Sequence, residues 1–195
     1  TLRQVPLRTD EGTWMDLGVS PDGRTIVFAL LGDIYTMPIE GGTPRRIAEG
    51  LAWEVQPRFS PDGRRIAFTS DRGGGDNIWV MNADGGDKRQ VTKEDFRLVN
   101  QASWSPDGEY IVAKKHFTTQ RSLGTGEIWI YHVSGGGGVK LVARASEELQ
   151  KELGEPVYAP AGDAVYYTRN TTPGNTFEYA QDSTQGNFAI EKIDL

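Results

Sequence analysis

The chain has 195 residues, of which 37% are hydrophobic and 25% charged; this composition is typical of a soluble globular domain and argues against disorder. A net charge of −6 argues against a nucleic-acid surface, because phosphate binding needs clustered Lys and Arg. No apolar run approaches the roughly 20 residues that cross a bilayer, so we expect no membrane insertion. The absence of cysteine excludes disulfides and thiolate chemistry.

A recurring turn sequence divides the chain into four repeats. Ser-Pro-Asp-Gly stands at 20–23, 60–63 and 105–108, and a diverged copy, Ala-Pro-Ala-Gly-Asp, stands at 159–163. This sequence suits a tight turn, because Pro presets φ, Asp bonds locally and Gly accepts positive φ. The first two intervals between the turn prolines match the ~40–45 residues of a four-stranded propeller blade, and the third is longer.

Each repeat contains the sequence of four short strands. The first strand ends just before the turn, in a column of large apolar residues: Val19, Phe59, Trp104 and Tyr158. The second follows the turn, and the third is nearly all apolar, at 34–37, 78–81, 128–131 and 188–190. Such runs predict burial on both faces. A Gly-rich turn then leads to an edge strand near Ile47, Val91 or Leu141.

These patterns predict an all-β fold, a β-propeller of about four four-stranded antiparallel blades. We expect one domain over residues 1–195, with repeats at approximately 13–50, 51–94, 95–145 and 146–195. The segment 1–12 would add an N-terminal edge strand at 2–7, where Pro6 restricts it to an edge position. The fourth repeat ends where the others run their outermost strand, so we expect a partial propeller; the alternative is a closed ring of four blades, completed by the strand at 2–7.

Loop lengths distinguish the two ends of the predicted blades. The loop between the second and third strands grows through the repeats, from 31–33 and 71–76 to 116–126 and 170–187. In up-and-down blades these loops share one face with the connections between blades. Loops on a rigid scaffold commonly carry binding sites, so we expect function on this face. A short helix is predicted within 145–154, with Ser146 as its N-cap and Gly154 as its stop.

The repeat sequence resembles a known family. Ser-Pro-Asp-Gly-Arg-x-Ile-x-Phe at 60–68, with Asn-Ile-Trp-Val-Met-Asn-Ala-Asp-Gly-Gly at 77–86, resembles the PD40 (WD40-like) repeats of TolB-type β-propellers. Such repeats also occur in the tricorn protease and in prolyl-oligopeptidase-type enzymes. Residues 9–15 and 30–42 are similar to the amino-terminal propeller of bacterial proteins whose carboxy-terminal half is a metal-dependent amidohydrolase. The resemblance implies a periplasmic or secreted bacterial protein.

The sequence offers little for catalysis. His116, expected in an enlarged loop, and His132, expected as a surface or interface imidazole, do not form His-x-His, and there is no Gly-x-Ser-x-Gly elbow. The acidic clusters around Asp71 and Asp76, and around Asp84, lack calcium-loop spacing, so turn formation explains them better. The four glycines at 135–138 do not follow the Walker pattern. We therefore expect no enzyme activity, cofactor or metal site in this chain.

Polar residues recur at one place in every repeat. Four residues before each turn serine, or its Ala159 equivalent, stand Asp16, Gln56, Gln101 and Glu155. They should ring the mouth of the central channel, and the adjoining loops would add Trp14, Trp53, Phe96 and Asn100. Two interpretations stay open: a solvated pore rim, and a contact patch for a peptide or partner.

These observations favour a non-catalytic interaction or substrate-gating module, the N-terminal segment of a larger amidohydrolase-type hydrolase. Its partner would be a protein, a peptide or the remainder of its own polypeptide. The alternatives are a freestanding TolB-like protein-binding propeller and the propeller of a prolyl-oligopeptidase or tricorn-type peptidase. A partial propeller would expose apolar flanks, including Tyr35 and Ile190, so self-association is a further expectation.

Overall fold

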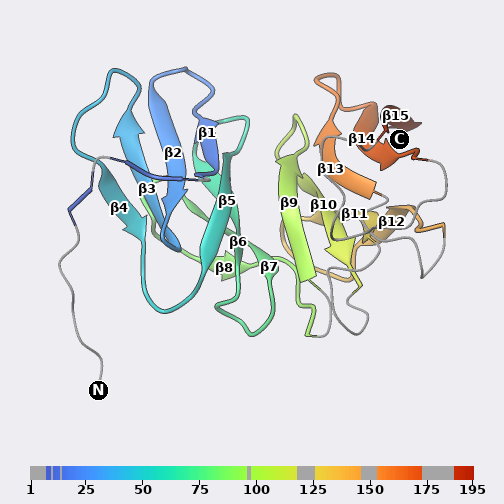
Figure 1. The fold of residues 1–195 in the computed structure, drawn as a ribbon, viewed down its shortest axis with the longest axis horizontal. Helices are drawn as coiled ribbons and strands as arrows, with labels where there is room; N and C mark the ends of the chain where they lie inside the picture. Colours follow the sequence, from blue (N-terminus) through green and yellow to red (C-terminus); the bar gives the residue numbers. More distant parts are fainter. Residues whose placement is uncertain are drawn as a thin grey trace.

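The computed structural model describes residues 8–9, 11–13, 15–95, 98–117, 126–145, 153–172 and 187–195. These residues form four antiparallel sheets that follow one another in chain order (Figure 1). The described part of the chain is all-β, without a helix, and therefore without a helix long enough to span a bilayer. The predicted fold class, a partial β-propeller built from antiparallel blades, is confirmed.

Every sheet runs from its first strand to its last in chain order. Blade 1 comprises β1 (Leu17–Val19), β2 (Thr25–Leu30), β3 (Asp33–Pro38) and β4 (Arg45–Ala48). Blade 2 comprises β5 (Glu54–Phe59), β6 (Arg65–Ser70), β7 (Asn77–Asn82) and β8 (Arg89–Gln90). Blade 3 comprises β9 (Leu98–Trp104), β10 (Tyr110–His116), β11 (Gly126–His132) and β12 (Val139–Val142). Within the described residues, blade 4 comprises three strands: β13 (Leu153–Tyr158), β14 (Ala164–Asn170) and β15 (Phe188–Asp194).

The recurring turn owes its shape to its own side chains. In blade 2, the Ser60 hydroxyl donates to Asp62 Oδ1 at 2.6 Å and accepts the Arg65 amide at 2.9 Å, while the Gly63 amide donates to the Ser60 carbonyl. Gly63 has a φ of 70°, which glycine adopts without strain. The serine hydroxyl holds the pKa of Asp62 below its ordinary value. The same serine–aspartate bond closes the turns of blades 1 and 3.

The hydrophobic core lies between the blades. Phe68 and Met81 of blade 2 pack with Ile34 of blade 1, and corresponding clusters join blade 2 to blade 3 and blade 3 to blade 4. The third strands β7 and β11 are largely buried, as their apolar sequences predict. For β15 the prediction of burial on both faces is wrong, because no described sheet packs against its outer face; Ile190 is 79% exposed, as expected for the flank of a partial propeller.

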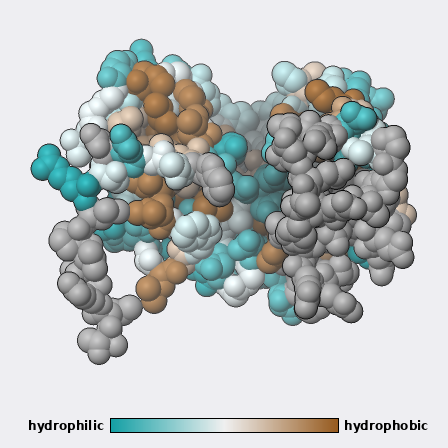
Figure 2. All heavy atoms as spheres, viewed as in Figure 1, coloured by the Kyte–Doolittle hydropathy of each residue, from teal (hydrophilic) through white to brown (hydrophobic). Residues whose placement is uncertain are grey.

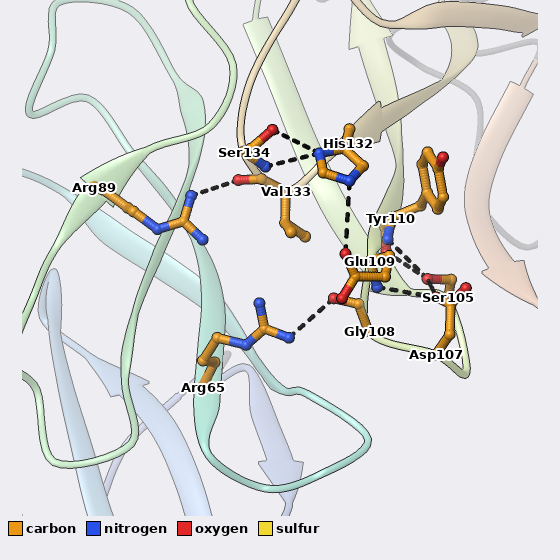
Figure 3. A network of polar contacts seen from close by, with 10 residues as sticks. All are labelled: Arg65, Arg89, Ser105, Asp107, Gly108, Glu109, Tyr110, His132, Val133 and Ser134. Atoms are coloured by element: carbon orange, nitrogen blue, oxygen red, sulfur yellow. Dashed lines mark hydrogen bonds and ion pairs between the residues drawn. The ribbon is translucent and has the colours of Figure 1, made fainter.

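Cations bridge neighbouring blades on the side of the short turns. Arg65 donates to the Gly108 carbonyl at 3.0 Å, and its guanidinium lies 5.0 Å from the centre of the Trp104 ring. Arg89 donates to the Val133 carbonyl, beside His132, whose Nε2 lies 3.6 Å from a Glu109 carboxylate oxygen (Figure 3). Both arginines reach from blade 2 to backbone oxygens of blade 3, so they fix the angle between the two sheets.

Two local predictions need correction, and others fall outside the described residues. The predicted helix cannot end at Gly154, because Leu153 and Gly154 already belong to β13. His116 is not in a loop: it is the last residue of β10 and pairs with Gly126, since these two strands continue further than their apolar runs. Residues 146–152 and the predicted edge strand at 2–7 lie outside the described residues.

Candidate functional site

The first strands of the blades line a groove of about 460 Å³. All four polar residues of the predicted rim line this groove: Asp16, Gln56, Gln101 and Glu155. Asp16 immediately precedes β1, whereas the other three lie inside the first strands of blades 2, 3 and 4. The structure thus brings together residues that stand about 40 to 54 positions apart in the sequence, as the repeat period requires.

The first strands of blades 2, 3 and 4 each contain a β-bulge at the rim position. Gln56, Gln101 and Glu155 have positive φ values of 56°, 58° and 36°, unusual for residues other than glycine. At each place the register between the first and second strands shifts, so that two residues oppose one. Bulges bend the strand and redirect side chains. The same strained geometry therefore recurs around the groove in blades 2, 3 and 4.

The glutamines of the rim connect one blade to the next. Gln56 Oε1 accepts the Gln101 amide at 2.9 Å and the Thr69 hydroxyl at 3.1 Å. Gln101 Oε1 in turn accepts the Glu155 amide at 3.3 Å. Each side chain thus satisfies the backbone donor that the bulge of the following blade presents. Two of the four predicted rim residues therefore have a structural role. We term these hydrogen bonds, from Gln56 through Gln101 to the Glu155 amide, the rim relay.

The two acidic residues of the rim differ from the two glutamines. Within the described residues, the carboxylates of Asp16 and Glu155 make no hydrogen bond or ion pair. They are thus the rim groups that remain available to a ligand, together with the backbone of the bulges. Such an arrangement can bind cationic or hydrogen-bond-donating groups of a peptide.

The groove also contains residues that sequence reasoning missed. Arg58 lines it and donates to the carbonyls of Leu17 and Pro57, at 3.0 and 2.9 Å. The indole of Trp104 donates to the Arg58 carbonyl at 3.0 Å, so blades 2 and 3 are joined here as well. Both residues follow a bulge, and beyond a bulge the simple alternation of side chains between the two faces of a strand no longer predicts which face a side chain takes. Only the place of Trp104 in the first-strand column, and that of Arg58 next to Phe59 of the same column, could have indicated them.

The predicted loop residues take separate places. Trp53 is 56% exposed on the loop before β5, and its amide donates to Asp71 Oδ1 at 2.7 Å. Asn100 lies inside β9, and its Oδ1 is 2.9 Å from His116 Nε2. Neither lines the groove. Trp14 and Phe96 lie outside the described residues.

The ionisable residues that the sequence offered as candidates for chemistry make hydrogen bonds within the fold: His116, Asp71 and Asp84. Burial, assisted by the charge of Lys114, lowers the pKa of His116 to about 3, so its ring is neutral at physiological pH. Asp84 accepts the amide of Gly86, two residues on, in keeping with its predicted turn role, whereas Asp71 Oδ1 accepts the amide of Trp53, eighteen positions away, and so links two separate loops. No group of three or more His, Cys, Asp or Glu side chains suited to a metal ion occurs in the described ranges.

Four-stranded sheets packed face to face around a groove lined by their first strands define a β-propeller. Residues 19–191 match the family of the Tricorn protease N-terminal beta propeller domain, and the chain belongs to that family.

Individual relatives cover the chain in part. The uncharacterized protein Atu1656 of Agrobacterium fabrum is 29% identical over an alignment of 164 residues, which covers 78% of this chain and 53% of that protein. The uncharacterized peptidase YuxL of Bacillus subtilis is 38% identical over 95 residues, 48% of this chain and 13% of that protein. The crystal structure of TolB from Acinetobacter baumannii superimposes with a TM-score of 0.63 and 21% identity, covering 92% of this chain and 41% of TolB. The chain thus spans about half, or much less, of these proteins.

Proposed function

We propose that this propeller is a non-catalytic interaction or substrate-gating module of a larger hydrolase. The observation that carries the proposal is the groove, which is lined by residues with a strained backbone and by Asp16 and Glu155. Strained backbone tends to persist at functional sites, where the surrounding structure holds it in place. The family and the peptidase relative support a hydrolase as the larger protein.

The type of hydrolase is a finer part of the proposal. The similarity of residues 9–15 and 30–42 to propellers of amidohydrolase proteins favours a metal-dependent amidohydrolase, and the relative YuxL favours a peptidase. The sequence of the intact gene product distinguishes them: several hundred further residues with His-x-His support the first, and a Gly-x-Ser-x-Gly elbow supports the second. A periplasmic or secreted location, which the resemblance implies, is tested by fractionation of the source cell.

The likeness to TolB favours the alternative of a freestanding binding propeller. Under that hypothesis the intact gene product carries no catalytic half. Its length therefore decides between the two functions.

Gating can be tested on the intact protein with a substitution that narrows the groove. Val157 lines the groove and is 54% exposed, so Val157→Trp should reduce its width without disturbing the core. We expect a higher KM, or a lower kcat/KM, for long peptide substrates and unchanged kinetics for a small chromogenic substrate. Val139→Trp, on β12 and outside the groove, is the matched control. Equal effects of both variants, or hydrolysis by residues 1–195 alone, would overturn the proposal.

A further inference from the structure

A second hollow lies beside the groove, where blade 1 meets blade 2. Its volume is about 750 Å³, and apolar side chains and carboxylates line it: Leu30, Leu31, Trp53, Val55, Glu11 and Asp16. Hydrophobic residues gather at the surface over the first blade, in the left half of Figure 2. Asp16 also lines the groove, so the two hollows share this residue.

Leu31 is an unexpected residue at its position. It forms the two-residue turn between β2 and β3 with Gly32, and the two have φ values of 55° and 85°. Turns with two positive φ values favour Asn-Gly or Asp-Gly, because a leucine is strained in the left-handed region. The Leu31 side chain is 68% exposed, so burial within the chain returns little for that strain. An exposed leucine retained in an unfavourable conformation indicates a contact outside the chain.

Trp53 is held firmly next to this turn. Its amide donates to Asp71 Oδ1 at 2.7 Å, and the following amide, of Glu54, donates to the Gly32 carbonyl at 3.0 Å. The indole lies directly over Gly32, where an added Cβ would be 2.9 Å from Trp53 Cε3. Only glycine therefore fits beneath the ring. A half-exposed indole has only two side-chain torsions to restrict on binding, and tryptophan is common among the residues that dominate interfaces.

Among the described residues, the charged residues that line this hollow are acidic. Glu11 and Asp16 contribute carboxylates to its lining, and no described residue of the lining is a lysine or arginine. Asp71 stands behind Trp53, and the chain as a whole carries a net charge of −6. An acidic rim around an apolar centre attracts cationic partners and repels acidic ones. It also disfavours the anionic surface of a membrane.

We propose that Leu31, Trp53 and Val55, with Glu11 and Asp16 at the rim, bind a cationic peptide segment. In that segment a large apolar side chain stands next to Lys or Arg: the apolar side chain packs against Trp53 and Leu31, and the cation pairs with Glu11 or Asp16. This inference rests on the proposed function, since it names the partner class of the interaction module. It is tested on residues 1–195 by binding, whereas gating is tested by the activity of the intact protein.

The experiment measures binding of three eight-residue peptides by isothermal titration calorimetry. The first carries Phe and Leu flanked by Lys and Arg, the second replaces the basic residues by Glu, and the third replaces the apolar residues by Ser. We expect the first to bind and the others to bind at least about tenfold more weakly. Leu31→Asn should weaken binding of the first peptide at least about tenfold, while the melting temperature stays unchanged or rises.

Val139→Asn is the matched control, because this exposed valine lies on β12, remote in sequence from the hollow; it should leave peptide binding unchanged. The inference is overturned if Leu31→Asn binds the first peptide as the unsubstituted chain does, or if the acidic peptide binds equally well. Absence of binding at millimolar peptide also overturns it. If Leu31→Asn instead dissociates a dimer in sedimentation, the surface takes a second copy of this chain, and the peptide assignment is wrong.

Discussion

A buried ion pair at the start of blade 2 offers a sharp test of the packing. Glu54 has no solvent exposure, and its Oε1 accepts two bonds from Arg72, from Nε at 3.1 Å and from Nη2 at 2.6 Å. Its Oε2 is buried without a hydrogen-bond partner. In the next two blades, the same position of the first strand, two residues before the rim residue, is held by the buried Val99 and Leu153. The sheet therefore accepts an apolar side chain where blade 2 has a carboxylate.

Arg72→Met should remove the partner and leave Glu54 buried. Breaking a buried ion pair costs about 3–5 kcal/mol, and we expect about 3 kcal/mol here, because the Arg72 side chain is 33% exposed. For a chain of this size, that lowers the melting temperature by about 6–12 °C. Adding Glu54→Leu should recover most of the loss, because the double variant has an apolar pair like those of the next blades.

The pH dependence of the stability loss in Arg72→Met tests the same argument independently. Burial raises the pKa of Glu54 above its ordinary value of 4.5, and Arg72 opposes that rise. A carboxyl whose pKa is higher in the folded state destabilises the fold as the pH rises through the window above 4.5. Removal of Arg72 should enlarge this penalty, so the loss in Arg72→Met should be larger at pH 7 than near pH 4.5. Equal losses at both pH values, or a shift below about 2 °C at pH 7, would refute the argument.

Four further predictions follow from the described contacts. Phe68 is completely buried, so Phe68→Ala should lower the free energy of unfolding by about 3–5 kcal/mol in chemical denaturation, and an unmoved midpoint would contradict its place in the core. Gln56→Ala removes two hydrogen bonds of the rim relay and should cost about 1–3 kcal/mol, whereas Gln56→Glu keeps the acceptor and should cost less. The serine hydroxyls lower the pKa values of Asp22, Asp62 and Asp107, so their stabilisation should be present above pH 3.8 and be lost as the pH falls below it; a flat acid stability curve would argue against this. The exposed Phe188 and Ile190 of β15 should promote self-association at micromolar concentration, which sedimentation should detect and Ile190→Lys should reduce; a monomer at every concentration would contradict it.

The repeated elements of the fold could be predicted because the sequence repeats their physical cause. Ser-Pro-Asp-Gly carries the hydroxyl, carboxylate and glycine that close each turn. The column of apolar residues predicts the last residue of each first strand, and the strands β5 and β9 do end at Phe59 and Trp104. The apolar run of its own strand predicts that Ile190 is buried, and only the expectation of a partial propeller predicts its exposure. An apolar run shows what a strand can bury, but burial also needs a neighbouring sheet. His116 was misplaced because Lys114 and Lys115 interrupt the apolar pattern of a strand that nevertheless continues.

The rim of the groove shows where prediction from spacing reaches its limit. Spacing alone places Asp16, Gln56, Gln101 and Glu155 at one level, because every blade repeats the same geometry. It cannot distinguish a side chain that is committed to its neighbour from one that faces a ligand. The difference arises from the bulges, whose backbone amides take up the two glutamine oxygens and leave the two carboxylates unpaired among the described residues.

Asp16 differs from the other rim residues because it is unpaired among the described residues and lines both the groove and the hollow. Leu31 and Trp53 line the same hollow. A cationic side chain that pairs with Asp16, beside an apolar neighbour at Trp53, would therefore lie against the residue that the hollow and the groove share. The sequence contains this arrangement only as an aspartate, a leucine and a tryptophan in separate loops, and the fold of two blades against each other is what makes it one surface.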